Sequence, residues 1–326
     1  MEQIALGTSG RHTTRLGFGC GSIMGVLGRH DSLKLLESAF DSGIRHFDVA
    51  PRYGYGEAES CLGEFLQRHP GQITVTTKYG IFPPKNISLV SLGRQIAGPV
   101  IKKLPGFKKS LAKVAKATTP NAERPSFTAA QARASLNNSL AHLRTNHIDL
   151  WLLHDVEAGD LHDDTLLHLM EDLVQQGTIG SFGIGTHSDK VPALVAQHPA
   201  YCRTLQYEWS ILDAAIDYST PFRIHHRSLT NHFHDLHHAL AKNKPLCDRW
   251  SASTDTDLSN PAALARLMLK ASLVMNPASI ILFSSKNPKH IQANALTAAD
   301  ITLEASARRL YELVQSEGDQ LLLPNP

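Results

Sequence analysis

The sequence predicts an α/β protein, a closed (β/α)8 TIM barrel that forms a single domain over residues 1–326. Two observations predict this fold. Short apolar runs rich in Ile, Val, Phe and Leu alternate with amphipathic helical stretches over nearly the whole chain, which is typical of a parallel sheet. Ionisable residues stand at the ends of several of these runs, where the catalytic groups of such barrels lie. Pro- and Gly-rich linkers that would divide the chain are not seen.

The chain is expected to begin with a β-hairpin, because residues 4–8 and 13–18 flank the turn sequence Ser9-Gly10-Arg11-His12. The eight expected barrel strands are residues 16–23, 44–49, 73–78, 148–154, 179–186, 204–209, 222–228 and 279–285. The expected helices are residues 31–42, 57–68, 128–143, 163–176, one that begins near residue 288, and 300–316. Asp31 is expected to cap the first helix, and Gly43 to end it.

Three glycines, at positions 17, 19 and 21, fall in the first expected strand. They lack the spacing of a dinucleotide-binding motif and follow no βαβ unit, so we interpret them as barrel backbone.

Composition and charge exclude several classes of protein. Hydrophobic residues make up 42% of the chain and charged residues 19%, as in globular proteins that bury a sizeable core. A net charge of +2 argues against nucleic acid as the main partner. The four scattered cysteines show no CxxC spacing and indicate reduced thiols. With no secretory signal at the start and no apolar run near ~20 residues, we expect a cytoplasmic protein without a membrane partner.

The stretch IRHFDVAPRYGYGEAE, residues 44–59, contains the strongest functional signal. Asp48 stands near the end of an apolar run, and Tyr53 follows it in a Pro- and Gly-rich turn. Two later strands deliver Lys78 and His154 at their carboxyl ends. Each residue alone could be a turn cap, a loop residue or a solvated strand end, because short motifs give many false positives. Their joint occurrence at strand ends predicts one site.

In this order the residues resemble the aldo-keto reductase superfamily, whose pattern is Asp-x-Ala-x-x-Tyr-Gly, then a strand ending in Lys, then a strand ending in Leu-His. The opening LG-x-(T/S)-G and TRLG-x-G sequences resemble the D-threo-aldose (L-fucose) 1-dehydrogenase-like branch. The resemblance implies a barrel plugged at its bottom by the N-terminal hairpin. It also implies an NAD(P)-dependent oxidoreductase acting on a small carbonyl or sugar substrate, as a monomer or small homo-oligomer.

The resemblance assigns roles that simple acid–base chemistry supports. Tyr53 would exchange a proton with the carbonyl oxygen during hydride transfer, although a phenol with a pKa of ~10 is a sluggish acid. A nearby Lys78 ammonium would lower that pKa, and Asp48 would hold the ammonium in place. His154 would donate a hydrogen bond to the substrate oxygen.

A second signal, SIILFSSKNPKHIQANA, lies at residues 279–295. Hydroxyl groups, an ammonium group and the free amides of a helix start make an anion site suited to a phosphate. The resemblance implies that this segment binds the adenosine phosphate of NADP, or of NAD, through Ser284, Ser285, Lys286, His290 and Asn294. Ser284 departs from the family, in which many members have lysine there. An ordinary polar helix start is the alternative.

The resemblance also implies a binding site for the nicotinamide, from residues at the ends of three expected strands. Gln206 matches the glutamine that binds the carboxamide, whereas the family's Ser-Asn pair is replaced by Thr186 and His187. His226 falls where an aromatic residue commonly stacks on the nicotinamide ring. A core or turn histidine is the alternative for His226.

Other features leave alternatives open. The segment NHFHDLHH, residues 231–238, could suggest a metal-dependent hydrolase, but it lacks the accompanying glutamate, so a solvated helix and no metal are predicted. A nicotinamide-binding barrel that senses redox state with little turnover is the second alternative. Residues 81–126 form a long insertion with nine Lys or Arg and one Glu, +9 − 1 = +8. It is expected to be either a lid that attracts anionic ligands or a solvated loop.

Overall fold

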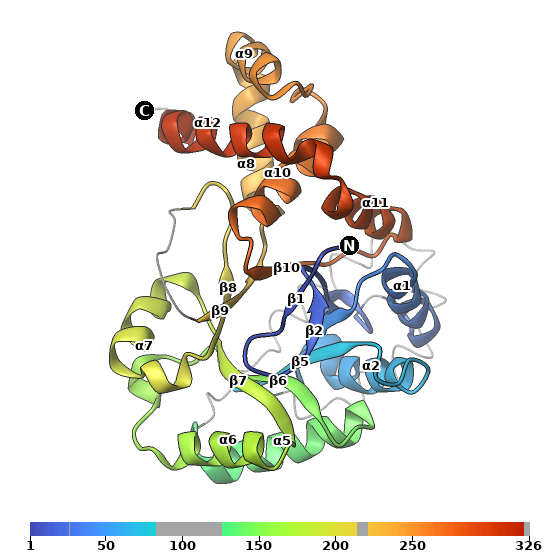
Figure 1. Ribbon diagram of the computed structural model, residues 1–326, viewed down its shortest axis with the longest axis vertical. Helices are drawn as coiled ribbons and strands as arrows, with labels where there is room; N and C mark the ends of the chain where they lie inside the picture. The colour runs from blue at the N-terminus through green and yellow to red at the C-terminus, as the bar shows by residue number, and fades with distance from the viewer. Residues whose placement is uncertain (26, 83–125, 214–220, 323–326) are drawn as a thin grey trace, which may run out of the picture.

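A computed structural model describes residues 1–25, 27–82, 126–213 and 221–322. Eight parallel strands form a closed barrel in the order β10-β3-β4-β5-β6-β7-β8-β9 (Figure 1). The strands are β3 (Leu16–Gly19), β4 (His46–Asp48), β5 (Thr74–Tyr79), β6 (Ile148–His154), β7 (Ile179–Gly185), β8 (Thr204–Glu208), β9 (Phe222–His226) and β10 (Ser279–Phe283). The predicted barrel is therefore confirmed, and the strands differ from their expected ranges mainly at their ends.

The N-terminal hairpin is formed by β1 (Gln3–Ala5) and β2 (His12–Thr14), which pair antiparallel. Its turn lies against the amino-terminal ends of the strands, because Thr8 Oγ1 is 2.8 Å from Ser181 Oγ near the start of β7. Leu6 is fully buried in a small cluster with apolar side chains of the barrel interior: Leu150, Ile224, Ile280 and Leu282. The hairpin thus closes the bottom of the barrel, as the family resemblance implied.

Helices surround the barrel. They are α1 (Arg29–Asp41), α2 (Ala58–Leu66), α5 (Ala129–Leu143), α6 (Thr165–Gln175), α7 (Val191–Gln197), α8 (Thr230–Lys242), α9 (Lys244–Thr254), α10 (Pro261–Met275), α11 (Pro288–Ala299) and α12 (Glu304–Leu322). Short 3-10 turns are η1 (Cys20–Ser22), η2 (Tyr53–Gly56), η3 (Ala158–Asp160), η4 (Ser188–Lys190), η5 (Pro199–Tyr201) and η6 (Ile301–Leu303). Figure 1 shows α9 and α12 at one end of the molecule, far from α5 and α6.

The first helix differs from the expectation. It begins at Arg29, and Gly28 is its N-cap without a side-chain hydrogen bond. Asp31 lies in the first turn instead, where its negative charge faces the positive end of the helix dipole. Helices α7, α9 and α10 were not expected. The sequence did contain a helix-start signal for α10, namely Asn260 followed by Pro261. In the structure the Asn260 side chain caps the helix by accepting hydrogen bonds from the amides of Ala262 and Ala263.

Polar side chains are buried at the starts of β4 and β5 as well as at their carboxyl ends. His46 on β4 is fully buried and bonds two hydroxyl groups of β5, with Nδ1 3.0 Å from Thr74 Oγ1 and Nε2 3.2 Å from Thr76 Oγ1. Burial lowers the pKa of His46 to about 4, so its imidazole is neutral at pH 7. Gly17 lies opposite His46 with little room for a side chain, since a Cβ there would lie 2.7 Å from the Leu282 side chain and 3.1 Å from the His46 ring. Gly17 and Gly19 thus lie in β3 as barrel backbone, whereas Gly21 lies in the 3-10 turn η1 that follows it.

The basic insertion and the histidine-rich segment can be compared with the structure only in part. Most of the basic insertion, residues 83–125, is not described, but the segment before it leaves the carboxyl end of β5, as expected. The histidine-rich segment does form a helix, α8. Within the described residues, no three His, Cys, Asp or Glu side chains are grouped to hold a metal ion. No helix among these residues is both long and apolar enough to cross a membrane.

Candidate active site

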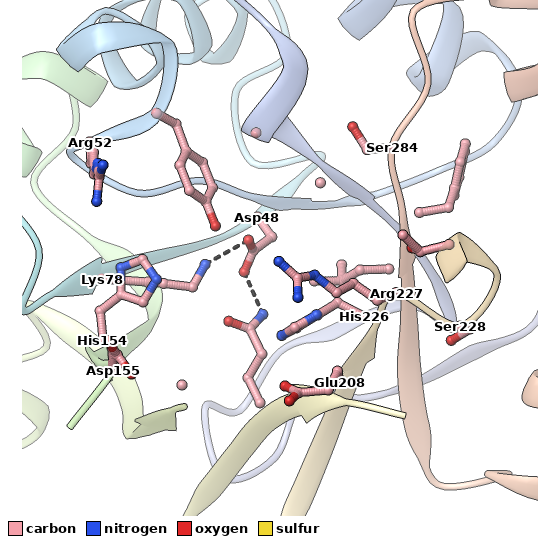
Figure 2. Close-up of a pocket in the computed structure, with 18 of the residues that line it drawn as sticks. Asp48, Arg52, Lys78, His154, Asp155, Glu208, His226, Arg227, Ser228 and Ser284 are labelled. Carbon is pink, nitrogen blue, oxygen red and sulfur yellow. Dashed lines mark hydrogen bonds and ion pairs between the residues drawn. The ribbon is translucent and has the colours of Figure 1, made fainter. Parts of the chain in front are cut away.

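The carboxyl ends of the strands open into a cavity of about 950 Å³. Asp48 ends β4, His154 ends β6, and Lys78 is the next-to-last residue of β5. Because the strands are parallel neighbours, these three side chains meet at the same end of the barrel (Figure 2). Tyr53 joins them from the loop after β4. The four residues predicted to be catalytic therefore line one cavity.

Lys78 and Asp48 form a buried ion pair at the cavity floor. Lys78 Nζ donates to Asp48 Oδ1 at 2.6 Å and to the Val49 carbonyl oxygen at 3.2 Å. Lys78 is 2% exposed and Asp48 is 3% exposed, so water competes little for either charge. The other carboxylate oxygen of Asp48 accepts a hydrogen bond from Gln206 Nε2 at 2.7 Å. The pair is thus held in one orientation, as Figure 2 shows.

Tyr53 is positioned by the tight turn η2. Gly54 has a φ of 59°, and a Cβ there would lie 2.9 Å from the Ile23 carbonyl oxygen, so the turn packs directly against the segment after β3. Lys78 Nζ lies 5.4 Å from the centre of the Tyr53 ring. The ring of His154 meets the Tyr53 ring edge-on, with centroids 6.3 Å apart.

The net pKa of Tyr53 differs from the sequence expectation. The Lys78 ammonium is the largest single influence and lowers the pKa, but burial, the Asp48 carboxylate and Cys20 raise it, and the net shift is upward. The pKa therefore lies above the usual value of ~10, and Tyr53 is a protonated phenol at pH 7. Lys78 does lower the pKa of Tyr53, as expected, but the opposing effects outweigh it and the net shift is upward. Burial, followed by Lys78, lowers the pKa of His154 to about 3, so its imidazole is neutral.

The three residues predicted at the carboxamide line the cavity, but each already has a partner. Gln206 donates to Asp48, and Thr186 Oγ1 donates to the Val156 carbonyl oxygen at 3.0 Å. His187 Nδ1 lies 3.1 Å from Glu208 Oε1. His226 also lines the cavity, and burial lowers its pKa to about 4.

The predicted phosphate-binding residues divide into two groups. Ser284 and Asn294 line the cavity, and Ser284 Oγ is 2.9 Å from Ser22 Oγ. Ser285, Lys286 and His290 are not part of its lining and lie at the solvent-facing start of α11. Ser285 Oγ is engaged locally, accepting from the Asn287 amide at 3.1 Å.

Sequence reasoning missed several cavity residues: Arg52, Tyr55, Asp155, Glu208, Arg227 and Ser228. Signals for two of them were available. Arg52 directly precedes Tyr53, and Glu208 lies two residues after Gln206, on the same face of β8. Tyr55, Asp155 and Arg227 have φ values of 60°, 58° and 58°. Side-chain-bearing residues rarely adopt this conformation, and such strain concentrates at functional sites.

Comparison with known proteins agrees with this arrangement. Residues 15–218 match the model of the aldo/keto reductase family, a span that includes Asp48, Tyr53, Lys78 and His154. The chain belongs to the aldo/keto reductase family.

Individual members of this family are similar over parts of the chain. It is 31% identical over 192 residues to D-threo-aldose 1-dehydrogenase of a Pseudomonas species, over 56% of this chain and 53% of that protein. This agrees with the branch expected from the sequence. It is 44% identical over 82 residues to pyridoxal 4-dehydrogenase of Microbacterium luteolum, over 24% of each chain. The matches thus span about half or less of these relatives' lengths.

The fold is shared more widely than the sequence. An aldo-keto reductase from Klebsiella pneumoniae, solved in complex with NADPH, has a TM-score of 0.61 at 17% identity, over 95% of both chains.

Proposed function

We propose that this protein is an NAD(P)-dependent oxidoreductase that transfers a hydride between a nicotinamide and the carbon of a carbonyl or sugar hemiacetal, with Tyr53 as general acid and base. The observation that carries the proposal is the buried Lys78–Asp48 pair beside Tyr53, in a cavity shared with His154. A structural ion pair would not need a phenol and an imidazole aimed at the same space.

The residues can handle the proton of such a reaction. A bound nicotinamide would supply or accept the hydride. In the reducing direction Tyr53 is already protonated at pH 7 and can give its proton to the oxygen that becomes negative. Lys78 would then stabilise the resulting phenolate. The neutral imidazole of His154 has one N–H group with which to orient the same oxygen.

The far side of the cavity fits the diphosphate of a dinucleotide. Ser228 is 4% exposed, lines the cavity, and its hydroxyl oxygen has no hydrogen-bond partner among the described residues. It is followed at once by the start of α8, whose N-cap, Leu229, gives no side-chain hydrogen bond. Free helix-start amides, an orphaned hydroxyl and the guanidinium of Arg227 together suit a phosphate.

NADP is the preferred cofactor in this proposal. Lys286 and His290 lie exposed where α11 begins, next to the cavity residue Ser284, and can reach a phosphate that projects toward solvent. The relative solved with NADPH supports the same choice. Ser284 carries no positive charge, so Lys286 and His290 would supply it.

Turnover measurements test the proposal against the redox-sensor alternative. NADPH oxidation is followed at 340 nm with a panel of aldehydes, and NAD⁺ or NADP⁺ reduction with a panel of aldoses. We expect steady turnover with at least one substrate and its loss in Lys78→Met. If the cofactor binds tightly but no member of either panel is turned over, the protein is not the oxidoreductase proposed.

A further inference from the structure

The charged side chains of the cavity are unevenly paired. Lys78 pairs with Asp48, and Asp155 Oδ1 accepts from Lys190 Nζ at 2.8 Å. Glu208 faces His187 at 3.1 Å. Each carboxylate in the wall therefore has a cationic or imidazole neighbour, which reduces its repulsion of a negative ligand.

The two arginines of the cavity wall, Arg52 and Arg227, differ from these carboxylates in having no partner of opposite charge among the described residues. Neither Arg52 nor Arg227 has a hydrogen bond or ion pair with another residue that the structure describes. A guanidinium in a concave site without a protein partner is well suited to a carboxylate or phosphate, which it can bind through two parallel N–H donors.

The two arginines lie on opposite sides of the cavity, so each is placed for a different ligand group. In Figure 2, Arg227 lies on the side of Ser228 and Ser284, the side assigned above to the cofactor phosphates. Arg52 lies on the opposite side, with His154 and Asp155. Because Arg52 directly precedes Tyr53 in the chain, its backbone is fixed beside the proposed proton donor. Its positive charge also acts on His154, where it helps to lower the imidazole pKa after the larger effects of burial, Lys78 and His226.

We propose that the substrate carries an anionic group, a carboxylate or a phosphate, and that the Arg52 guanidinium binds this group while the carbonyl faces Tyr53. The inference rests on the proposed function and adds a substrate class to it. Arg52 is then a specificity-determining residue, and a neutral substrate of the same length leaves its guanidinium without a partner.

Matched substrate pairs test this inference. Succinic semialdehyde is compared with butanal, and glyceraldehyde 3-phosphate with glyceraldehyde, each by kcat/KM with NADPH. We expect the anionic member of at least one pair to be preferred at least about tenfold. Arg52→Gln should lower that preference by about 10- to 100-fold, as expected for a hydrogen bond to a charged group. Arg52→Lys should retain part of it, because the point charge remains but the paired donors do not.

The matched control is Arg133→Gln on α5, an exposed arginine outside the cavity lining, which removes the same charge and should leave the preference unchanged. The pair that responds to Arg52→Gln identifies the anion as carboxylate or phosphate. Should Arg52→Gln not fold, Arg52→Lys replaces it: inhibition of butanal reduction by succinate, and not by succinamide, should be strong in the wild type and weaker in Arg52→Lys.

The outcomes separate the two proposals. If none of the four aldehydes nor any member of the wider panels is reduced, the proposed function fails. If neutral aldehydes are reduced but the anionic members gain no preference, or Arg52→Gln and Arg133→Gln have equal effects, the oxidoreductase stands and the Arg52 inference is wrong.

Discussion

Replacing Lys78 by Met should destabilise the protein as well as abolish turnover. Methionine has a similar length but no charge, so the carboxylate of Asp48 would stay 3% exposed with only the hydrogen bond from Gln206 Nε2 still in place. Removing one partner of a buried ion pair typically costs about 3–5 kcal/mol of unfolding free energy, because the other charge is left uncompensated. Asp48→Asn should cost a similar amount, since the buried Lys78 ammonium would lose the negative charge that neutralises it.

The double variant Asp48→Asn with Lys78→Met decides whether this reasoning holds. The double variant leaves no buried charge, and the asparagine can still accept a hydrogen bond from Gln206. Its loss of unfolding free energy should therefore be much smaller than the sum of the losses in the two single variants. The expected coupling energy is at least about 3 kcal/mol. The assay is equilibrium urea unfolding at pH 7, followed by tryptophan fluorescence, with the m-values compared to check that the transition stays comparable.

The chain offers a matched control pair on its surface. Lys244 and Asp248 on α9 are also 2.6 Å apart, but their side chains are 82% and 63% exposed. The corresponding cycle, Lys244→Met with Asp248→Asn, should show no measurable coupling because water screens both charges. A coupling at Lys78 and Asp48 no larger than at this surface pair would refute the account of the buried pair.

Two further predictions follow from the structure. Lys286→Ala and His290→Ala should each weaken NADPH binding far more than NADH binding, measured by fluorescence titration; equal losses for both cofactors would mean that neither side chain holds the 2′-phosphate. The Glu59 carboxylate, 3.6 Å from His142 Nδ1, raises the pKa of that histidine. The resulting stability is fully present below the unfolded pKa of ~6.5 and is lost as pH rises through the folded pKa, so His142→Gln should destabilise the protein at pH 5.5 and not at pH 8.5. An equal loss of unfolding free energy at pH 5.5 and pH 8.5 would contradict a stabilising ion pair between His142 and Glu59.

The fold and the four central residues could be predicted because their signals are local. A buried strand that ends in an ionisable residue is visible in the sequence, and parallel strands bring such ends together. Asp48, Lys78 and His154 therefore met as expected once the barrel closed. The start of α1 was misplaced because a glycine, Gly28, caps that helix without a side-chain signal.

The pKa shifts of the site residues and their hydrogen-bond partners could not be predicted from local sequence signals. The raised pKa of Tyr53 depends on how deeply the phenol is buried and on how Asp48 offsets Lys78, which are properties of packing. Likewise, Gln206 matches a cofactor-binding position, yet only the folded barrel shows that its amide donates to Asp48. The position of Arg52 next to Tyr53 is visible in the sequence, but the role proposed for it rests on how the other charges of the cavity wall are paired, which only the folded barrel shows.

The most direct test of the central claim is the variant Tyr53→Phe, which removes only the phenol oxygen. With the best substrate found in the panels, kcat should fall by about 10²- to 10⁴-fold, the usual contribution of a general acid. The dissociation constant for NADPH, measured by fluorescence titration, should stay within about twofold of the parent, because the phenol is needed for proton transfer and not for holding the adenosine end. A variant that keeps near wild-type kcat would contradict the assignment of Tyr53 as the proton donor.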